Sequence, residues 1–341
     1  MTDVVTEALD RARVEAAWAL MIGASRIALL AHEHPDGDAL GSALGLAHVL
    51  RGLGKTCLPA CADPAPPLYG FLPGLDGLQR DLGAEDFDLV IALDAGELTR
   101  YGALYERHRA FLDRVPIVNL DHHVTSSGCG QVSIIDVQSA ATAELITLLL
   151  LQLGVSILRD AAVCLMTGII TDTRAFEYSA TTPRTLEVAA HLMRAGAVPA
   201  EIVKPVYRVT PLAKARLWGL VQSAIESSSG GRLVWSSLTE QMWRASGAEV
   251  GADDSLSSYL IDLEGAKIAV LFKDDADGSP RVSLRTAPPY HAARLAAHFG
   301  GGGHERAAGF TFRGTLEQAK TEVLAYLETQ MHSIDQGGEP K

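Results

Sequence analysis

LLAHEHPDGDALGS, at residues 29–42, ends an apolar run and is followed at once by an apolar helical pattern. His32, Asp36 and Asp38 are crowded between these two segments. A hydrophobic strand, a polar turn and a helix in this order form ligand sites at the carboxyl ends of strands in open α/β sheets. Two aspartates so close together raise each other's pKa, and a bound cation removes that penalty. The stretch therefore predicts a metal site whose remaining ligands lie elsewhere in the chain.

The composition is that of a globular protein with room for two domains. The 341 residues are 48% hydrophobic and 21% charged, which is ample for a buried core. Mean hydropathy is +0.13, yet no apolar run reaches the roughly 18 residues that span a membrane. The acidic, amphipathic start is unlike a signal peptide, and four cysteines fit no zinc or disulfide framework. We expect a cytoplasmic protein without membrane contact.

The formal net charge of −12 limits the class of partner. Broad contact with nucleic acid needs a basic surface, so the charge argues against binding of long duplex nucleic acid. A short anionic substrate held at a metal site is compatible with it.

Strands and helices alternate through the first part of the chain. Strands are expected at 25–31, 55–61, 88–96, 116–123 and 131–136, and helices at 5–22, 39–53, 97–113, 139–154 and 182–195, with a further buried segment at 159–171. This alternation predicts an α/β fold with a mostly parallel sheet and helices on both faces.

The pattern changes after a turn at 227–231. RLVWSSL, AKIAVLFKD and PRVSLRT alternate as strands do, with short helices between and after them. We expect a catalytic domain at 1–195, a helical linker at 196–228, a smaller α/β substrate-binding domain at 229–337 and a disordered tail at 338–341.

Polar residues also follow other apolar segments. Asp94 ends one segment, Asp121, His122 and His123 end the next, and Asp172 ends a third. One aspartate at a strand end is usually a helix cap or a turn residue. The carboxyl ends of parallel strands meet at one edge of a sheet, however, and the whole set in this order outweighs the structural interpretation.

The candidate ligands are four carboxylates and two imidazoles: His32, Asp36, Asp38, Asp94, His122 and Asp172. Oxygen-rich mixed sites suit Mn²⁺, with Mg²⁺ or Co²⁺ as alternatives. Six ligands predict two ions, with His32 and Asp36 on one, Asp38, His122 and Asp172 on the other, and Asp94 between them. Two ions about 3.5–4 Å apart can activate a water and stabilise a phosphoryl transition state.

Two neighbours of these ligands have expected roles of their own. His123 points beyond the metals and donates to a phosphate oxygen or the leaving group, which makes it, with Asp94, a catalytic residue. Asp121 fixes an imidazole by a hydrogen bond.

The second domain carries a glycine run, GGGGH, at 300–304. Such a run lets backbone N–H groups approach an anion, and His304 adds a donor. Arg285, on the strand VSLRT, has a planar guanidinium that suits phosphate. A glycine run alone is more often a loop, so this assignment depends on the anionic substrate expected at the metal site.

HEHPDGDALGS, LDAG, DHH and TDT, followed by VSLR and GGGGHERAAGF, resemble the DHH phosphoesterases with a C-terminal DHH-associated domain. Within that superfamily, length and layout are similar to the bifunctional oligoribonuclease/pAp phosphatases, or nano-RNases. The resemblance covers nearly the whole chain. It implies a cleft between the domains, two Mn²⁺ on the six ligands above, and His123 beside the scissile phosphate. It also implies that the substrate phosphate and nucleotide are held by Arg285, Gly301, Gly302, Gly303 and His304.

The function implied is that of a manganese-dependent phosphodiesterase and phosphatase. Relatives degrade nanoRNA and linear dinucleotides to mononucleotides and remove the 3′-phosphate of pAp, by attack of a metal-activated water on phosphorus; they also suggest a homodimer. His34 and Arg174 stand where relatives often carry Asn and many carry Gly, and Arg174 adds positive charge near the metals.

Several alternatives stay open. A cyclic-di-AMP phosphodiesterase would use the same chemistry. A RecJ-like single-strand exonuclease should carry extra domains and a basic groove, neither of which is visible. An inorganic pyrophosphatase shares the metal motifs but not the glycine run, and a non-catalytic nucleotide-binding regulator should lack a ligand.

Overall fold

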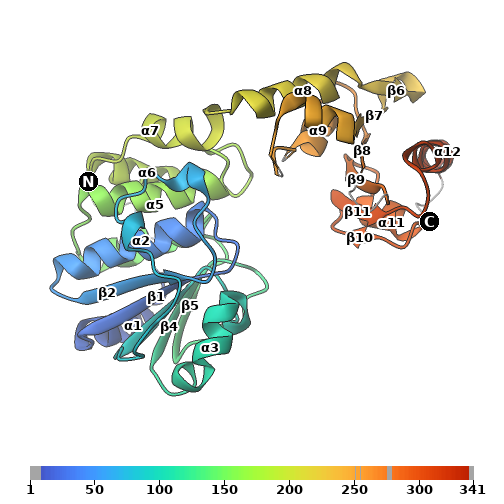
Figure 1. The fold of residues 1–341 in the computed structure, drawn as a ribbon. Helices are drawn as coiled ribbons and strands as arrows, with labels where there is room; N and C mark the ends of the chain where they lie inside the picture. Colours follow the sequence, from blue (N-terminus) through green and yellow to red (C-terminus); the bar gives the residue numbers. More distant parts are fainter. Residues whose placement is uncertain (1–8, 250, 254, 275–278, 338–341) are drawn as a thin grey trace. The chain divides into compact units, whose positions relative to one another are not determined.

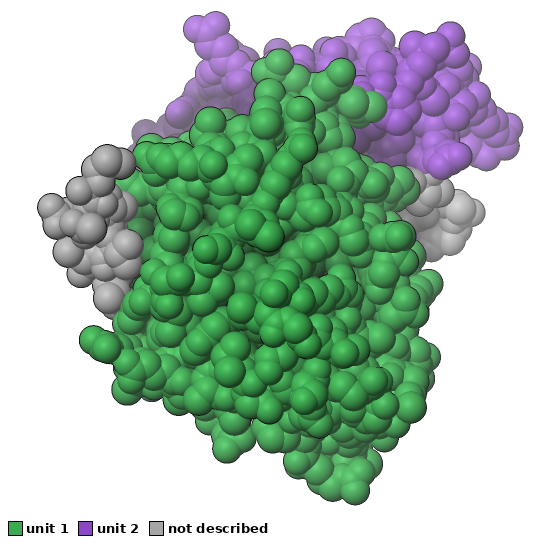
Figure 2. Space-filling view, turned by 90° about the vertical axis from the view of Figure 1, so that its left-hand side faces the viewer, with its two compact units in different colours: residues 1–209 green, residues 210–341 purple. Residues whose placement is uncertain are grey.

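The computed structural model describes residues 9–249, 251–253, 255–274 and 279–337. The chain divides into two compact units, Met1–Val209 (unit 1) and Thr210–Lys341 (unit 2), coloured separately in Figure 2. Each unit has its own sheet and hydrophobic cores, as the alternation of strands and helices predicted. The expected tail at 338–341 and the first residues of the helix expected from residue 5 lie outside the described residues.

Unit 1 is built on a parallel sheet of five strands (Figure 1). These are β1 (Arg26–Ala31), β2 (Thr56–Cys61), β3 (Leu89–Leu93), β4 (Ile117–Asp121) and β5 (Val132–Ile135), in the spatial order β2-β1-β3-β4-β5. The chain leaves β1 toward β2 on one side and later places β3 on the other side. The point between β1 and β3 is therefore the topological switch point, where ligands bind at the carboxyl ends of the strands.

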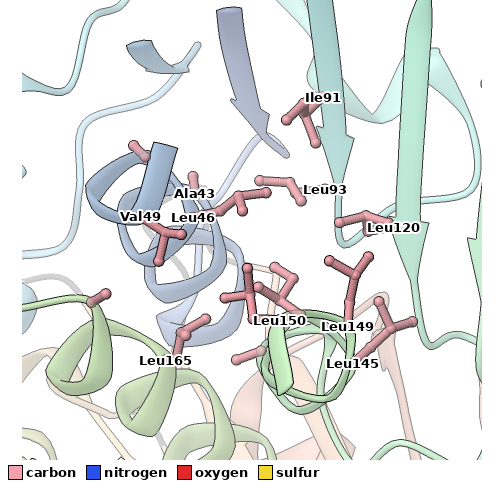
Figure 3. Packing of buried hydrophobic residues seen from close by; sticks show 14 of the residues in the cluster. Ala43, Leu46, Val49, Ile91, Leu93, Leu120, Leu145, Leu149, Leu150 and Leu165 are labelled. Carbon is pink, nitrogen blue, oxygen red and sulfur yellow. The ribbon is translucent and has the colours of Figure 1, made fainter. Parts of the chain in front are cut away.

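Helices cover both faces of this sheet. The helices of unit 1 are α1 (Arg11–Gly23), α2 (Gly37–Gly52), α3 (Ala103–Leu112), α4 (Thr142–Gln152), α5 (Arg159–Asp172), α6 (Pro183–Arg194) and α7 (Pro199–Val203), followed by a π-helical turn, Lys204–Arg208. Helices α6 and α7 pack mainly against α5. Figure 3 shows Ile91 and Leu93 of β3 and Leu120 of β4 with Leu145 and Leu149 of α4 in one core. The opposite face packs against α3 in a second core.

Helix α2 approaches α5 closely because glycines recur every four residues along one of its faces. They are Gly37, Gly41 and Gly45. A Cβ added at Gly37 would lie 2.5 Å from Thr171 Oγ1, and one added at Gly41 would overlap the carbonyl oxygen of Cys164. Glycine is required at these positions because no side chain fits between the helices.

The observed helices differ from the expected ones by up to three residues at their ends in α2 and α4, and by more in two other places. Helix α1 begins at Arg11, because the Asp10 side chain caps it by accepting from the N–H groups of Ala12 and Arg13. The single helix expected at 97–113 is wrong. A 3-10 turn at Leu98–Tyr101 precedes α3, and Gly102 between them has a φ of 53°, outside the helical region.

Unit 2 is a smaller α/β unit around a mixed sheet of six strands. These are β6 (Glu226–Ser228), β7 (Leu233–Leu238), β8 (Ile268–Lys273), β9 (Arg281–Thr286), β10 (Gly302–Gly303) and β11 (Ala307–Thr311), in the order β10-β11-β9-β8-β7-β6. Among the described strands of unit 2, only β7 and β8 pair in parallel. The helices are α8 (Leu212–Ser223), α9 (Glu240–Ser246), α10 (Leu256–Ile261), α11 (Ala292–Ala297) and α12 (Leu316–Asp335).

The two faces of this second sheet are covered unequally. Val270 of β8 and Leu284 of β9 belong to the core that α11 and α12 complete. On the other face, Leu271 of β8 packs with Leu217 and Val221 of α8, so α8 is part of unit 2. Strand β9 alternates between buried and more exposed residues, which leaves part of this face open. Among the described residues of both units, no helix combines the length and apolarity that crossing a membrane requires.

Candidate metal centre and phosphate-binding face

The first donor set lies at the switch point of the unit 1 sheet. His32 directly follows β1 and is 6% exposed. Its Nδ1 is 2.7 Å from the carbonyl oxygen of Glu33, while its Nε2 is 3.4 Å from Asp94 Oδ2 and 3.9 Å from Asp36 Oδ1. The donor atoms of His32, Asp36 and Asp94 lie within 4.8 Å of one another, close enough to hold one metal ion.

The second donor set comes from three different elements. Asp38 is in the first turn of α2, His122 follows β4, and Asp172 ends α5. His122 Nε2 is 3.2 Å from Asp172 Oδ2 and 3.9 Å from Asp38 Oδ2. This nitrogen is buried and has no hydrogen-bond partner among the described residues. An imidazole nitrogen that faces several carboxylates, yet forms no well-aligned hydrogen bond with them among the described residues, fits a position beside a shared cation.

Asp94 lies between the two sets. Its Oδ2 faces His32, and its Oδ1 is 3.6 Å from His122 Nε2 and accepts a 2.8 Å hydrogen bond from Thr142 Oγ1. Asp94 is only 3% exposed and has a φ of 60°. The left-handed region is uncommon for residues other than glycine and clusters at functional sites. The structure thus brings the six candidate donors together, with His123 near Asp94 and His122 as well, and their division between two ions stays a prediction.

The carboxylate of Asp38 is fixed by the first turn of α4. Asp38 is fully buried and accepts from the N–H groups of Thr142 and Ala143 at 2.6 and 2.9 Å. These amides have no partner within the helix, and the helix dipole favours an anion there. Sequence reasoning missed Thr142. A threonine before an apolar helical run signals a helix start, but it does not show which distant aspartate the helix meets.

Asp36 both caps a helix and faces the first donor set. Its Oδ1 accepts from the N–H groups of Asp38 and Ala39, both at 3.0 Å, so it caps α2. The same carboxylate belongs to the first donor set.

The electrostatics of the cluster favour a divalent cation. Burial, together with the charges of Asp94 and Asp172, raises the pKa of Asp38 well above its ordinary value. Burial and Asp94 likewise raise the pKa of Asp36. Burial alone would lower the pKa of His32, but its hydrogen bonds with Asp94 and Glu33 outweigh this and raise it to about 9. Four carboxylates face only two imidazoles in this cluster, so negative charge exceeds positive charge even when both rings are protonated, and the oxygen-rich donor set fits a divalent metal that offsets it.

His123 and Asp121 lie beside the donors. Asp121 is buried, and its Oδ1 accepts from His123 Nδ1 at 2.7 Å and from the His122 N–H at 2.8 Å. The hydrogen bond with Asp121 raises the pKa of His123, whose side chain is half exposed. Asp121 therefore makes the hydrogen bond to an imidazole that was expected of it.

In unit 2, some of the residues expected to bind phosphate line a hollow and others do not. A hollow with a volume of about 530 Å³ is lined by Arg281, Ser283, Gly300, Gly301, Gly302, Ala308, Gly309, Phe310 and Thr311. Gly301 and Gly302 thus line the hollow. Arg285, Gly303 and His304 are not among its lining residues, although Arg285 shares one face of β9 with Arg281 and Ser283. Sequence reasoning missed Arg281, which the alternation in PRVSLRT could have indicated.

The backbone of the glycine run is largely engaged within the fold. The N–H groups of Gly300 and Gly301 donate to carbonyl oxygens at the end of α11, and the His304 N–H donates to Ala307. The expectation that the amides of this run face an anion is therefore wrong for these three. Glycine is needed here because Gly303 has a φ of 146° and because a Cβ at Gly301 would overlap the carbonyl oxygen of Gly309.

His34 and Arg174 both have left-handed backbones. His34 has a φ of 53°, and its N–H donates to Asp63 Oδ2 at 2.8 Å. Arg174 has a φ of 49°, and its Nε is 3.2 Å from Glu177 Oε2. Asparagine and glycine adopt this region more readily than histidine and arginine. The two positions at which this chain differs from the expected Asn and Gly are therefore positions of backbone strain.

Comparisons with known proteins identify the family of each unit. Residues 26–169 match the DHH family, N-terminal domain, and residues 237–333 match the DHHA1 domain. The bifunctional oligoribonuclease and PAP phosphatase NrnA of Thermus thermophilus is 34% identical, over 89% of this chain and 90% of its own length. The protein of the same name from Bacillus subtilis is 27% identical, over 89% of this chain and 94% of its own.

A solved structure has the same fold over nearly the whole chain. The crystal structure of an exopolyphosphatase-related protein from Bacteroides fragilis matches with a TM-score of 0.81 at 25% identity, covering 94% of this chain and 97% of that one. Fold and site thus define a hydrolase of the phosphoesterase class. The chain belongs to the DHH family and carries a C-terminal DHHA1 domain.

Proposed function

We propose that this chain is a cytoplasmic, manganese-dependent phosphodiesterase and phosphatase. Its substrates are short oligonucleotides and linear dinucleotides, which it hydrolyses to mononucleotides, and pAp, from which it removes the 3′-phosphate. The names of its relatives in Thermus thermophilus and Bacillus subtilis, each a bifunctional oligoribonuclease and PAP phosphatase, support oligoribonucleotides and pAp as substrates. The observation that carries the proposal is the position of Asp94, buried between two donor sets, beside an imidazole nitrogen of His122 that has no hydrogen-bond partner among the described residues.

The proposal assigns two divalent cations to the two donor sets. His32 and Asp36 hold one, Asp38, His122 and Asp172 hold the other, and Asp94 is shared. When bound, such ions activate a water and stabilise the charge of a phosphoryl transition state. The donor set is rich in oxygen and has no thiolate, which favours Mn²⁺, with Mg²⁺ or Co²⁺ as substitutes.

The chain's own residues orient the donors and move a proton. Thr142 and Ala143 hold the carboxylate of Asp38, so this donor is fixed before substrate arrives. Asp121 accepts from His123 Nδ1 and thereby orients the ring. The raised pKa of His123 favours its protonated form, which donates to a phosphate oxygen or to the leaving group.

The proposal assigns phosphate recognition to unit 2. Arg285 lies on the partly open face of β9, and a guanidinium can bind a phosphate in bidentate fashion. Gly301, Gly302, Gly303 and the His304 side chain complete this group; because the amides of Gly301 and His304 are engaged within the fold, the glycines contribute close approach of the backbone rather than those two amides. A local pocket of this kind suits a short substrate, and the net charge of −12 disfavours long duplex nucleic acid. A homodimer is also part of the proposal.

A hydrolysis panel tests the proposal. Wild-type protein with Mn²⁺ is given a labelled five-nucleotide RNA, a dinucleotide, pAp, a long single-stranded DNA, cyclic di-AMP and pyrophosphate. We expect the first three to be cleaved fastest, activity to be lost with a chelator, and Mn²⁺ to restore it better than Mg²⁺ or Co²⁺. Much faster turnover of the DNA, cyclic di-AMP or pyrophosphate would overturn the substrate assignment, and full activity in chelator would overturn the metal dependence.

A further inference from the structure

The segment 136–144, between β5 and the first turn of α4, contacts three of the candidate ligands. The carbonyl oxygen of Ser139 is 3.2 Å from His122 Nδ1. The Thr142 N–H donates to Asp38, and the Thr142 hydroxyl donates to Asp94. One short stretch of backbone therefore orients ligands that come from β3, β4 and α2.

The same segment is held from its other side by a guanidinium. Arg184 of α6 has a side chain only 12% exposed. Its Nη2 donates to Asp136 Oδ2 at 2.7 Å and to Ser139 Oγ at 3.2 Å, and its Nε donates to Glu144 Oε1 at 3.1 Å. Because Asp136 and Glu144 are the two ends of the segment, this one planar group fixes the distance between them.

Glu144 completes the network from within the segment. It is fully buried, and its Oε2 accepts from the Ala140 N–H and from the Thr185 hydroxyl, both at 2.9 Å. A buried ion pair of this kind is weak evidence for stability, because desolvation offsets the attraction between its charges. Its geometry, by contrast, is specific: every contact acts on the segment that holds the ligands.

We propose that Arg184 is a positioning residue of the metal centre. By joining Asp136 to Glu144, it holds Ser139 and Thr142 where they orient His122, Asp38 and Asp94. The inference depends on the proposed metal-dependent function. Arg184 would affect the metal centre only through Ser139 and Thr142, without binding the metal itself. Removing a group that hydrogen-bonds directly to a metal ligand typically weakens metal affinity by about 10- to 100-fold, and this range is the upper limit for a residue one contact further out.

The test compares Mn²⁺ affinity with folding stability. Arg184→Met alone leaves Glu144 buried without its cation, so the main variant is the double substitution Arg184→Met, Glu144→Gln. The new amide oxygen can still accept from Ala140, which preserves the local hydrogen bond. Equilibrium dialysis with Mn²⁺ measures affinity, and urea unfolding without metal measures stability. A second variant, Arg184→Lys, keeps the charge but cannot span both carboxylates with a fork.

We expect the double variant to bind Mn²⁺ roughly 10-fold more weakly than wild type, with kcat on pAp reduced more than KM is raised, and Arg184→Lys to lie between them. The matched control is Arg26→Gln. It removes an Nη2–Asp86 contact of the same 2.7 Å at the opposite end of β1, and its affinity should stay at the wild-type value.

Equal Mn²⁺ affinity in wild type and in a folded Arg184 variant would overturn the inference, since a purely structural role changes only the unfolding curve. That outcome leaves the proposed function intact, because wild type still binds Mn²⁺ and cleaves its substrates. No Mn²⁺ uptake by wild type would instead overturn both.

Discussion

The carboxyl edge of the sheet in unit 1 and the open face of the sheet in unit 2 hold their charged groups in opposite ways. At the edge, Asp38 is fully buried, and each of its oxygens accepts a backbone N–H. On the open face, Arg285 is partly exposed and donates to a carbonyl of its own strand, that of Leu284. The first arrangement fixes donor atoms in space, and the second leaves a cation able to move toward a ligand.

The difference matches the physical demands on each region. Metal ligands must be held within a few tenths of an ångström, so burial and full hydrogen bonding are useful despite their effect on pKa. Phosphate recognition by arginine gains from charge and a bidentate fork and tolerates solvent. We therefore expect substitutions at the edge to abolish chemistry and substitutions on the open face to weaken substrate binding.

The largest effect is expected from Asp94→Ala, because this carboxylate faces both donor sets. Removing it should lower kcat on the five-nucleotide RNA by at least about 10³-fold, since charge stabilisation at a metal site is worth several kcal/mol. Steady-state kinetics with Mn²⁺ measures this. Asp88→Asn, at the other end of β3, is the matched control and should keep its activity. Retention of a tenth of the wild-type kcat in Asp94→Ala would mean that Asp94 is not shared between two ions.

The second-largest effect is expected from Gly168→Ala, at the contact between α5 and the candidate ligand Asp38. A Cβ at Gly168 would overlap Asp38 Oδ1 and lie 2.6 Å from the Cβ of Ala143. Gly168→Ala should therefore displace Asp38, lower the free energy of unfolding by about 1–3 kcal/mol and weaken Mn²⁺ binding. Urea unfolding and equilibrium dialysis measure the two effects.

Gly219→Ala is the control for that substitution. Gly219 is in α8, and a Cβ there meets nothing within 4 Å among the described residues. Since alanine is the better helix former, this variant should be more stable by up to about 1 kcal/mol. Equal behaviour of the two variants would show that α5 does not constrain Asp38.

On the open face, Arg285→Ala should act mainly on binding. A charge-assisted hydrogen bond to phosphate is worth about 1.5–3 kcal/mol, so KM for the dinucleotide and for pAp should rise by roughly 10- to 100-fold with little change in kcat. Arg313→Ala, an exposed arginine just beyond β11, is the control and should leave KM unchanged. A fall in kcat with constant KM would contradict the assignment of Arg285 to recognition.

The same comparison explains how much the sequence could predict. The candidate donors that follow strands could be placed at one edge because the carboxyl ends of parallel strands meet, as His32 after β1 and Asp94 after β3 illustrate. Asp172 ends helix α5, so the strand rule does not explain its place beside His122. The α/β class followed from the same alternation. Rules of this kind predict that a residue lies at the edge of the sheet without requiring knowledge of the residues that it contacts.

What the sequence could not predict depends on contacts between distant segments. Thr142 meets Asp38 across 104 positions, and Arg184 meets Glu144 across 40, so no local pattern contains either pair. The glycine run illustrates the opposite error. Its composition suggested free amides, but Gly300 and Gly301 use theirs to end α11, a common requirement of helix ends.

The smallest effect is expected from Asp88→Asn, which concerns the end of β3 remote from the metal donors. Hydrogen bonds from the N–H groups of Arg26 and Ser25 lower the pKa of Asp88 below its ordinary value. A lowered pKa stabilises the fold above the unfolded value of about 3.9 and loses that effect as pH falls through the folded value. Because the side chain is exposed and an amide oxygen can still accept, the substitution should lower the free energy of unfolding by less than about 1 kcal/mol at neutral pH. Urea unfolding should show this difference shrinking below about pH 4. If the difference in free energy of unfolding grew on acidification, the protonated carboxyl of Asp88 would be the better hydrogen-bond partner of β1. Asp88→Asn could then no longer serve as the control for Asp94→Ala.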